Sequence, residues 1–309
     1  MASQSGPRVQ ADGVLVVDKT EGPTSHDVVT LARRALGVSR IGHTGTLDPM
    51  ATGVLPLVVG RATRLAQFLS ASDKTYEATI AFGRTTDTYD VTGTVAARCD
   101  RRPSREALDA ALLAFTGQFE QTPPAYSAKN IDGERAYDLA RKNKHTTLQR
   151  PKAVSVIVTR LRVMSFDGES ARLEMQVSAG FYVRSLAHDL GEALGCGAVL
   201  AALRRTRAGE FDLRRAVPLA EVVQSPRELL AAKLVPLNEL MADIPAVVLR
   251  SATEVERVKN GVEVGPTDVM APLAALPPMV RLLDPAHNLL ALAKPGKTPG
   301  YLHGWVVLA

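Results

Sequence analysis

The sequence predicts an α+β protein with a large domain over residues 12–245 and a small β-rich domain over residues 246–309. A short disordered leader is expected over residues 1–11. Two observations favour this class. Short apolar or alternating runs, typical of strands, are mixed with runs of helical spacing without a regular βαβα order. After about Pro245 the chain changes to short apolar runs separated by proline and glycine. A length of 309 residues suits two domains.

The first elements of the large domain follow from local patterns. The run GVLVVD at 13–18 is short, apolar and β-branched, which predicts a buried strand. A helix is expected next, capped by Ser25 and ended by Gly37, because apolar residues recur between them at helical spacing. Two glycines and a proline within 41–52 predict a loop, with a strand at 54–59 after it.

Later segments continue the mixture of strands and helices. Strands are expected at 76–82 and 172–177, and helices at 104–115 and 181–194.

In the small domain, Ser251 and Glu254 form a capping box ahead of a short helix that reaches about Asn260. Strands are expected at 280–283, 289–293 and 305–308.

Composition limits the class of protein. Lys and Arg number 37 against 32 Asp and Glu, a net charge of +5 that mildly favours a polyanionic partner. No apolar run approaches the roughly 20 residues of a membrane helix, so no membrane association is expected. The two cysteines, Cys99 and Cys196, give neither a disulfide framework nor a metal-ligand spacing and suit a reducing cytoplasm. No nucleotide-binding glycine motif occurs, and no metal or other cofactor is expected.

Two clusters of basic residues are candidates for phosphate contacts, although such runs are usually solvated faces. One cluster is Arg204, Arg205, Arg207, Arg214 and Arg215, and the other is Arg141, Lys142, Lys144, Arg150 and Lys152.

The glycine-containing segment at 41–52 carries more polar groups than a turn requires. His43, Thr44 and Thr46 precede Asp48, which stands before Pro49. On composition alone, an Asx-type turn with Asp48 capping backbone amides is the favoured interpretation.

A wider resemblance changes that interpretation. The segment IGHTGTLDPMATGVLPLVVG at 41–60 resembles the catalytic segment of bacterial tRNA pseudouridine-55 synthases, the TruB family. Other segments match the family in the same order between about Val14 and Phe211. They are LVVDKTEGPTSHDVV, DKTYEA, FGRTTDTYDVTG, PPAYSAKNIDGERAYDLAR and AGFYVRSLAHDLGEALGCGAVLAALRRTRAGEF. The ordered set is highly specific, and the chain is identified as a member of this family.

The resemblance implies a fold and a reaction. The fold is that of pseudouridine synthases, a mixed and largely antiparallel central sheet flanked by helices, followed by a PUA-like domain. In the reaction, a uridine loses its N1–C1′ bond and gains a C5–C1′ bond. Asp48 matches the catalytic nucleophile, Arg184 matches the arginine beside it, and Tyr76 matches the tyrosine that stacks on the uracil and helps to move the C5 proton.

The resemblance also implies residues that contact the substrate. Leu203 matches an apolar residue that packs under the base, and Lys129 stands one place before the position where the family commonly has lysine, here Asn130. The expected substrate-binding residues are His43, Tyr182, Leu203, Lys19, Asp90 and Lys129. The expected partner is the T-loop of tRNA, with the target base flipped out of its stack, and the expected state is a cytoplasmic monomer.

Several alternatives remain open from the sequence. Asp48 attacks uracil C6 or assists departure of the base at ribose C1′. The enzyme acts at position 55 or is a related synthase for another RNA position. The small domain binds RNA or is a structural cap. A different class altogether is an RNA-binding or tRNA-folding factor with little or no catalysis, although such a binder has no need of Asp48, Tyr76, Tyr182 and Arg184 together.

Overall fold

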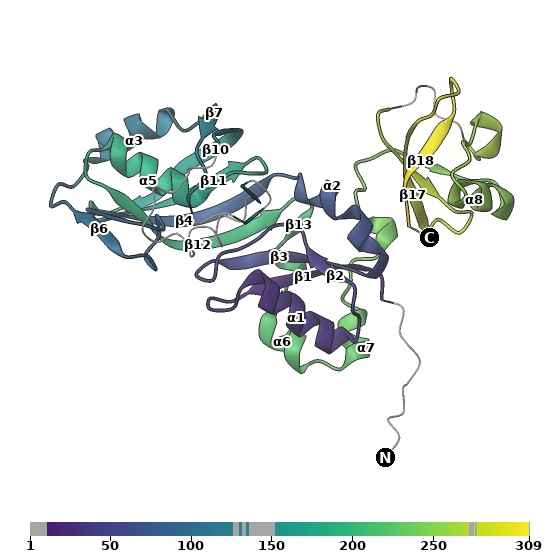
Figure 1. Ribbon diagram of the computed structural model, residues 1–309, viewed down its shortest axis with the longest axis horizontal. Helices are drawn as coiled ribbons and strands as arrows, with labels where there is room; N and C mark the ends of the chain where they lie inside the picture. The colour runs from purple at the N-terminus through teal and green to yellow at the C-terminus, as the bar shows by residue number, and fades with distance from the viewer. Residues whose placement is uncertain are drawn as a thin grey trace, which may run out of the picture.

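The large domain is organised around one extended mixed sheet (Figure 1). This computed structural model describes residues 11–125, 130–131, 134–135, 152–271, 275 and 277–308. Within them, ten strands join in this sheet, with the main order β14-β1-β3-β12-β4-β11-β10-β7; β13 pairs with β12 and β2 with β3. The strands are β1 (Gly13–Lys19), β2 (Ile41–His43), β3 (Thr52–Val59), β4 (Lys74–Phe82), β7 (Gly117–Gln121), β10 (Val154–Phe166), β11 (Ser170–Val177), β12 (Ala198–Ala208), β13 (Phe211–Asp212) and β14 (Val217–Pro218).

Most of the pairings in this sheet are antiparallel. Among the described strands of this sheet, only the β1–β14 and β12–β3 pairs are parallel. Two small hairpins lie outside the sheet, β5 (Arg84–Thr86) with β6 (Val95–Arg98), and β8 (Asn130–Ile131) with β9 (Glu134–Arg135). The expected mixed, largely antiparallel sheet is therefore confirmed.

Helices cover the sheet in two groups (Figure 1). At one end, α1 (Ser25–Leu36) packs with α6 (Leu219–Gln224) and α7 (Arg227–Ala231) near β1. At the other end, α3 (Arg105–Leu113) and α5 (Val183–Ala193) pack against β10, β12 and β4. The short elements η1 (Gly60–Leu65) and α2 (Ala66–Ser70) connect β3 to β4.

A second, four-stranded sheet begins at residue 246, where the sequence predicted a new domain. Its order is β15-β16-β17-β18, formed by β15 (Ala246–Val248), β16 (Val280–Leu283), β17 (Leu289–Pro295) and β18 (Leu302–Val307). The helix α8 (Ala252–Lys259) packs on β18 and is capped by Ser251 as predicted. The remaining elements are the short 3₁₀ turns η2 (Leu213–Arg215), η3 (Leu237–Glu239) and η4 (Pro266–Asp268).

The two sheets share part of their apolar core. Leu289, Leu292 and Leu308 of the C-terminal unit are buried in one cluster with Val58 and Phe211 of the large sheet. The C-terminal unit is therefore packed against the large domain.

Some local predictions were wrong. Thr24, not Ser25, caps α1, because its hydroxyl accepts from the Asp27 amide and Asp27 reciprocates in a capping box. The predicted loop at 41–52 contains the strand Ile41–His43, which pairs with β3. The predicted helix at 181–194 begins only at Val183.

The sequence analysis made no prediction for two long strands, β10 and β12. The alternation of apolar and polar residues in β10 was a usable strand signal. The sequence of β12, AVLAALRRTRA, is instead rich in residues that favour helices, and its strand form comes from its partners on both sides, β3 and β4.

Candidate active site

Two buried cations hold the loop between β2 and β3 that carries Asp48. The side chain of Lys19 is fully buried, and its ammonium group donates to the carbonyl oxygens of Thr20, Pro49 and Ala51 at 3.0, 3.1 and 2.6 Å. This places Lys19 beneath the loop, where its donors are occupied by backbone carbonyls. A buried ammonium that meets three acceptors is satisfied, and it ties the end of β1 to the segment that follows Asp48.

Arg205 holds the other side of the same loop. It is 1% exposed, and its guanidinium donates to the carbonyls of Val54 at 2.7 Å and Gly45 at 3.0 Å. The close approach of β3 to β12 depends on Gly53, since a Cβ there would lie 2.2 Å from the Arg205 carbonyl oxygen and φ is +100°.

Ser25 fixes the middle of the loop. Its hydroxyl accepts from the amide of Leu47 at 2.8 Å and donates to the carbonyl of Leu47 at 3.0 Å. This is the role that the structure gives to the serine that was expected to cap α1. The backbone next to Asp48 is thereby anchored to the first turn of α1.

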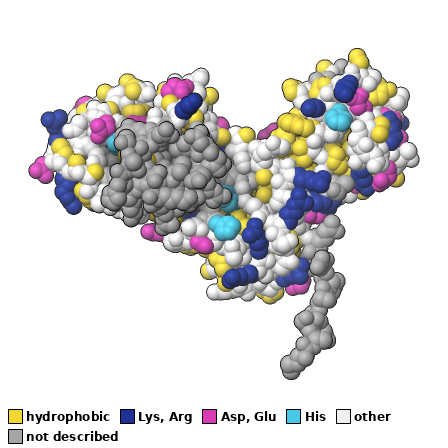
Figure 2. Space-filling model, in the orientation of Figure 1, with side chains coloured by type: hydrophobic (Ala, Val, Ile, Leu, Met, Phe, Trp, Pro, Cys, Tyr) yellow, Lys and Arg dark blue, Asp and Glu magenta, His cyan; other side chains and the backbone are white. Residues whose placement is uncertain are grey.

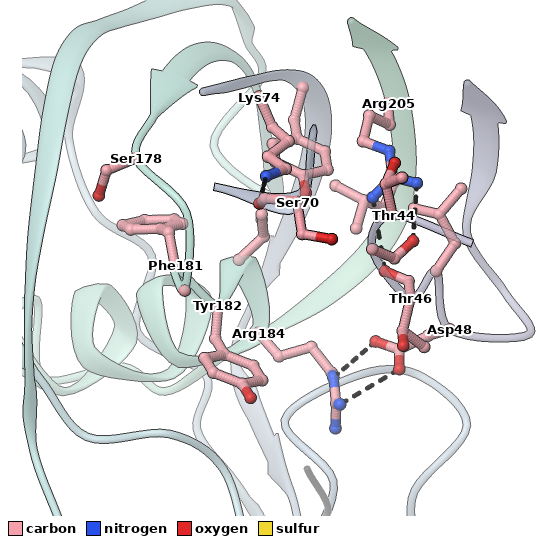
Figure 3. Close-up of a pocket in the computed structure, with 16 residues that line it drawn as sticks. Thr44, Thr46, Asp48, Ser70, Lys74, Ser178, Phe181, Tyr182, Arg184 and Arg205 are labelled. Carbon is pink, nitrogen blue, oxygen red and sulfur yellow. Dashed lines mark hydrogen bonds and ion pairs between the residues drawn. The ribbon is translucent and has the colours of Figure 1, made fainter. Parts of the chain in front are cut away.

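Asp48 forms an ion pair with Arg184 of α5. Nε of Arg184 lies 2.9 Å from Oδ2 of Asp48, and Nη2 lies 3.3 Å from Oδ1, so the contact is two-pronged (Figure 3). The Arg184 side chain is 8% exposed, whereas that of Asp48 is 34% exposed. The carboxylate is therefore accessible while its partner is buried, an arrangement that suits a reactive group held by a fixed cation.

A cavity of about 260 Å³ opens beside this pair. Its walls include Tyr76 from β4, Leu203 from β12, and Phe181 and Tyr182 from the segment before α5. Figure 3 shows Asp48 and Arg184 at one end, with Ser178 and Phe181 farther away. The full lining is Thr44, Gly45, Thr46, Leu47, Asp48, Ser70, Lys74, Tyr76, Ser178, Gly180, Phe181, Tyr182, Val183, Arg184, Leu203 and Arg205.

The segment that carries Tyr182 is held by Gln121, a buried residue that the sequence analysis missed. The Gln121 side-chain amide accepts from the backbone N–H of Tyr182 at 2.8 Å and donates to its carbonyl at 3.0 Å. One turn into α5, the Ser185 hydroxyl donates to the Thr122 carbonyl at 2.8 Å. The end of β7 therefore sets the start of the helix that bears Arg184.

The other expected site residues lie around this centre. Asp90 is buried, and its Oδ2 lies 3.9 Å from Nε of Arg184. His43 ends β2 and accepts from the Gly45 amide at 3.3 Å through Nδ1, but it is not among the residues that line the cavity. Lys129 lies outside the described residues. Tyr76, Tyr182, Leu203, Asp48 and Arg184 meet in one cavity.

Two lysines near the loop have unusual protonation equilibria. Burial, only partly offset by Asp48, lowers the pKa of Lys19 to about 8. Burial and the neighbouring Arg205 lower the pKa of Lys74 to about 8. Lys74 lines the cavity, and its ammonium group donates to the Ser70 carbonyl at the end of α2. Nothing in the sequence pattern marked it beyond its place in DKTYEA.

The basic cluster around 204–215 does not form one solvated face. Successive side chains of a strand point to opposite faces, so Arg205 is buried beneath the loop while Arg204 pairs with Asp18 at 2.8 Å. Arg214 pairs with Asp212, and Arg215 pairs with Glu239. Most of the second cluster, Arg141, Lys142, Lys144 and Arg150, lies outside the described residues.

The residues that the structure describes contain no group of three or more His, Cys, Asp or Glu side chains placed to hold a metal ion. None of their helices combines the length and apolar character needed to cross a membrane.

Comparison with known proteins places this site in a family. Residues 33–183 match the N-terminal domain of TruB family pseudouridylate synthases, and residues 184–242 match the C-terminal domain of tRNA pseudouridylate synthase B. The chain belongs to the TruB family. Its two matched regions form parts of one sheet, since β12 of the second region lies between β3 and β4 of the first.

The sequences of relatives from several bacteria align with most of this chain. A protein named tRNA pseudouridine synthase B from Solibacter usitatus (strain Ellin6076) is 46% identical over 252 residues, covering 81% of this chain and 85% of the relative. One of the same name from Thermobifida fusca (strain YX) is 42% identical over 299 residues, covering 92% and 97%. The family resemblance stated from the motifs is confirmed.

Solved structures show the same fold. A chain from an H/ACA ribonucleoprotein bound to a substrate RNA containing 2′-deoxyuridine superposes with a TM-score of 0.73 at 23% identity, covering 97% of this chain and 86% of that one. A chain from the archaeal box H/ACA Nop10–Cbf5 complex superposes with a TM-score of 0.70 at 24% identity, covering 99% and 89%. The expected pseudouridine synthase fold is thereby confirmed.

Proposed function

We propose that this chain converts the uridine at position 55 in the T-loop of tRNA to pseudouridine, with Asp48 as the catalytic nucleophile. The observation that carries the proposal is the ion pair of an accessible Asp48 with a buried Arg184 at one end of a cavity walled by Tyr76 and Leu203. Membership of the TruB family supplies the reaction class, and the names of the relatives supply tRNA as substrate.

The geometry suits the chemistry of the isomerisation. The reaction breaks N1–C1′, forms C5–C1′ and releases the C5 proton, so neither an oxidant nor an energy source enters. An ionised carboxylate is needed either to attack the pyrimidine ring or to assist departure of the base. Arg184 neutralises and orients the Asp48 carboxylate through two contacts while leaving it accessible to substrate.

The cavity walls suit a flipped base. A uridine must leave its stack to reach a carboxylate inside a protein. Tyr76 presents an aromatic ring and Leu203 an apolar side chain to the cavity, and stacking of this kind stabilises a bound base by about 1–3 kcal/mol. In this proposal Tyr76 stacks on the uracil and helps to move the C5 proton, Leu203 packs under it, and Tyr182 contacts the substrate.

The surface offers a partner for RNA phosphates. Figure 2 shows Lys and Arg side chains gathered over α1 and α2. Arg33 and Arg34 stand in the last turn of α1, and Arg61 and Arg64 belong to η1, the element before α2. We place the T-arm backbone along this face, which predicts salt-dependent binding. We propose that His43 and Asp90 contact the RNA or support its displaced T-loop. Lys19 supports the protein loop that carries Asp48 from beneath.

The proposal includes a cellular setting. We propose a cytoplasmic location, because tRNA is the substrate and both cysteines are free thiols. We propose a monomer on the family resemblance alone.

Release of tritium from C5-labelled uridine in an unmodified T-arm transcript tests the function. Native protein should release one tritium per target uridine, and Asp48→Asn should reduce the rate by at least about 10³-fold. Asp109→Asn is the matched control, since Asp109 pairs with Arg105 on an exposed face of α3.

Changing the T-loop uridine to cytidine should abolish release by native protein. Release that survives this change would move the target to another RNA position. Tight T-arm binding with no release from any tRNA would overturn the enzymatic proposal in favour of an RNA-binding factor.

A further inference from the structure

The loop between β5 and β6 contains a tyrosine in an unfavourable backbone conformation. Tyr89 has φ +64°, in the left-handed region that residues with a side chain seldom adopt. Its ring stacks on that of His188 of α5, with centroids 3.9 Å apart and planes inclined by 5°. An unfavourable conformation persists only where surrounding contacts hold it, and this stack is such a contact.

The neighbours of Tyr89 in the chain contact the catalytic arginine. The carbonyl of Thr88 accepts from Nη1 of Arg184 at 3.2 Å, and the carboxylate of Asp90 lies 3.9 Å from Nε of Arg184. His188 stands four residues after Arg184, so both side chains lie on the same face of α5. The loop therefore meets α5 at two successive turns, through the arginine and through the ring stack.

The backbone on either side of Asp90 is also fixed to β12. The carbonyl of Tyr89 accepts from the Leu200 amide at 3.0 Å, and the Val91 amide donates to the Leu200 carbonyl at 3.0 Å. Asp90 accepts from the hydroxyls of Thr88 and Thr92 at 2.8 and 2.6 Å. These contacts leave the Tyr89 side chain directed at α5 rather than at solvent, in agreement with its partial burial.

We propose that the Tyr89–His188 stack sets the position of the Arg184 guanidinium and, through it, that of Asp48. Neither Tyr89 nor His188 lines the cavity, so both are positioning residues. The stack holds the Thr88–Asp90 backbone against α5. The Arg184 guanidinium then contacts the Thr88 carbonyl and the Asp90 carboxylate as well as the Asp48 carboxylate. This inference rests on the proposed function, since it concerns the geometry of the same ion pair.

Four variants test the inference in the tritium-release assay on the T-arm transcript. His188→Ala removes the ring, and His188→Phe keeps a flat ring without its nitrogens. Tyr89→Gly removes the ring but accepts φ +64° without strain. Phe166→Leu is the matched control, because it disrupts a ring pair with Phe82 outside the active site.

We expect His188→Ala and Tyr89→Gly each to lower kcat about ten- to a hundredfold, because small displacements of catalytic groups have effects of this size. KM should change by less than about threefold in both, since neither residue lines the cavity. His188→Phe should restore most of kcat, and Phe166→Leu should leave kcat unchanged.

A double-variant experiment locates the effect. In an Arg184→Met background, His188→Ala should cause no further loss of the residual rate, because its influence passes through the guanidinium. Native kcat in His188→Ala or in Tyr89→Gly, or a full additional loss in the Arg184→Met background, would overturn the inference while leaving the proposed function intact. Absence of release by native protein would instead overturn the proposed function, and this inference with it.

Discussion

The two sheets of this protein bury different kinds of side chain. The large sheet and its loops bury Lys19, Lys74, Asp90, Arg184 and Arg205. In the C-terminal unit, the buried cluster around β15–β18 consists of apolar residues such as Val247, Leu282 and Leu302. Among the described residues that follow position 205 in the chain, no charged side chain is buried.

Burial of a charge is unfavourable unless hydrogen bonds and opposite charges compensate it. In the large sheet that compensation comes from the loop carbonyls that Lys19 and Arg205 hold, and from the carboxylates that Arg184 meets. In the large sheet the compensated charges hold the Asp48 loop, whereas the apolar cluster of the C-terminal unit needs no such partners.

The C-terminal unit nevertheless contacts an element that reaches the cavity. The Trp305 ring packs edge-on against Phe68 of α2 with centroids 5.0 Å apart, and Arg61 donates to the Leu308 carbonyl at 3.3 Å. Two residues beyond Phe68, Ser70 lines the cavity. The two sheets therefore differ in the kind of side chain that they bury, although the two units pack directly against each other.

The largest expected effect tests the charged centre. Arg184→Met removes the cation beside Asp48, and we expect kcat for tritium release to fall roughly 10²–10³-fold. Arg105→Met removes an exposed arginine of similar ion-pair geometry and should leave kcat within about twofold. Equal rates for native protein and Arg184→Met would show that the buried charge is structural, and the contrast between the sheets would lose its functional meaning.

An apolar change in the C-terminal unit should give the opposite pattern. Leu292 is fully buried in the cluster shared by the two sheets. Leu292→Ala should lower the free energy of unfolding by about 2–5 kcal/mol, measured by urea denaturation, because it leaves a cavity. At temperatures where the variant stays folded, kcat should match native. A large fall in kcat in the folded variant would contradict the division of roles.

The smallest expected effect appears in the pH dependence of stability. Lys19 has a pKa of about 8 in the folded protein against its ordinary 10.5, so the unfolded chain binds more protons between these values. The free energy of unfolding therefore gains a contribution that rises with pH across this window, by up to about 3 kcal/mol.

Lys19→Met should lose that contribution. Urea denaturation between pH 7.5 and about 10 should show a smaller rise for the variant than for native protein. Lys233→Met is the control, since Lys233 pairs with Glu221 at the surface. Identical pH slopes for native protein and Lys19→Met would mean that the Lys19 ammonium is not desolvated.

Local patterns predicted the elements that carry their own signals. The helix over 25–36 and the strands at 52–59 and 74–82 appear where capping residues, apolar spacing and alternation placed them, within a few residues. The strand β12 did not, because its alanines, leucines and arginines favour a helix and only pairing with β3 and β4 overrides them.

The site residues also divide into those marked by a local motif and those whose role depends on contacts made by the fold. Asp48 and Tyr76 were identified by their motifs, while Gln121 was missed because its role depends on a backbone contact with Tyr182, 61 residues away. Arg205 was grouped with its neighbouring arginines as a candidate phosphate contact or part of a solvated face, because the sequence does not show which face of a strand is covered.

The sequence alone determined the class of the protein, the change in pattern near residue 246, where a second sheet begins, and the motifs that match the TruB family. These are properties of local spacing and residue identity. Only the tertiary structure decided which charges are buried, which carbonyls satisfy them and that Arg184 meets Asp48 from 136 residues away. The physical reason is that the free energy of a buried charge depends on partners brought together by the fold, which local sequence does not specify.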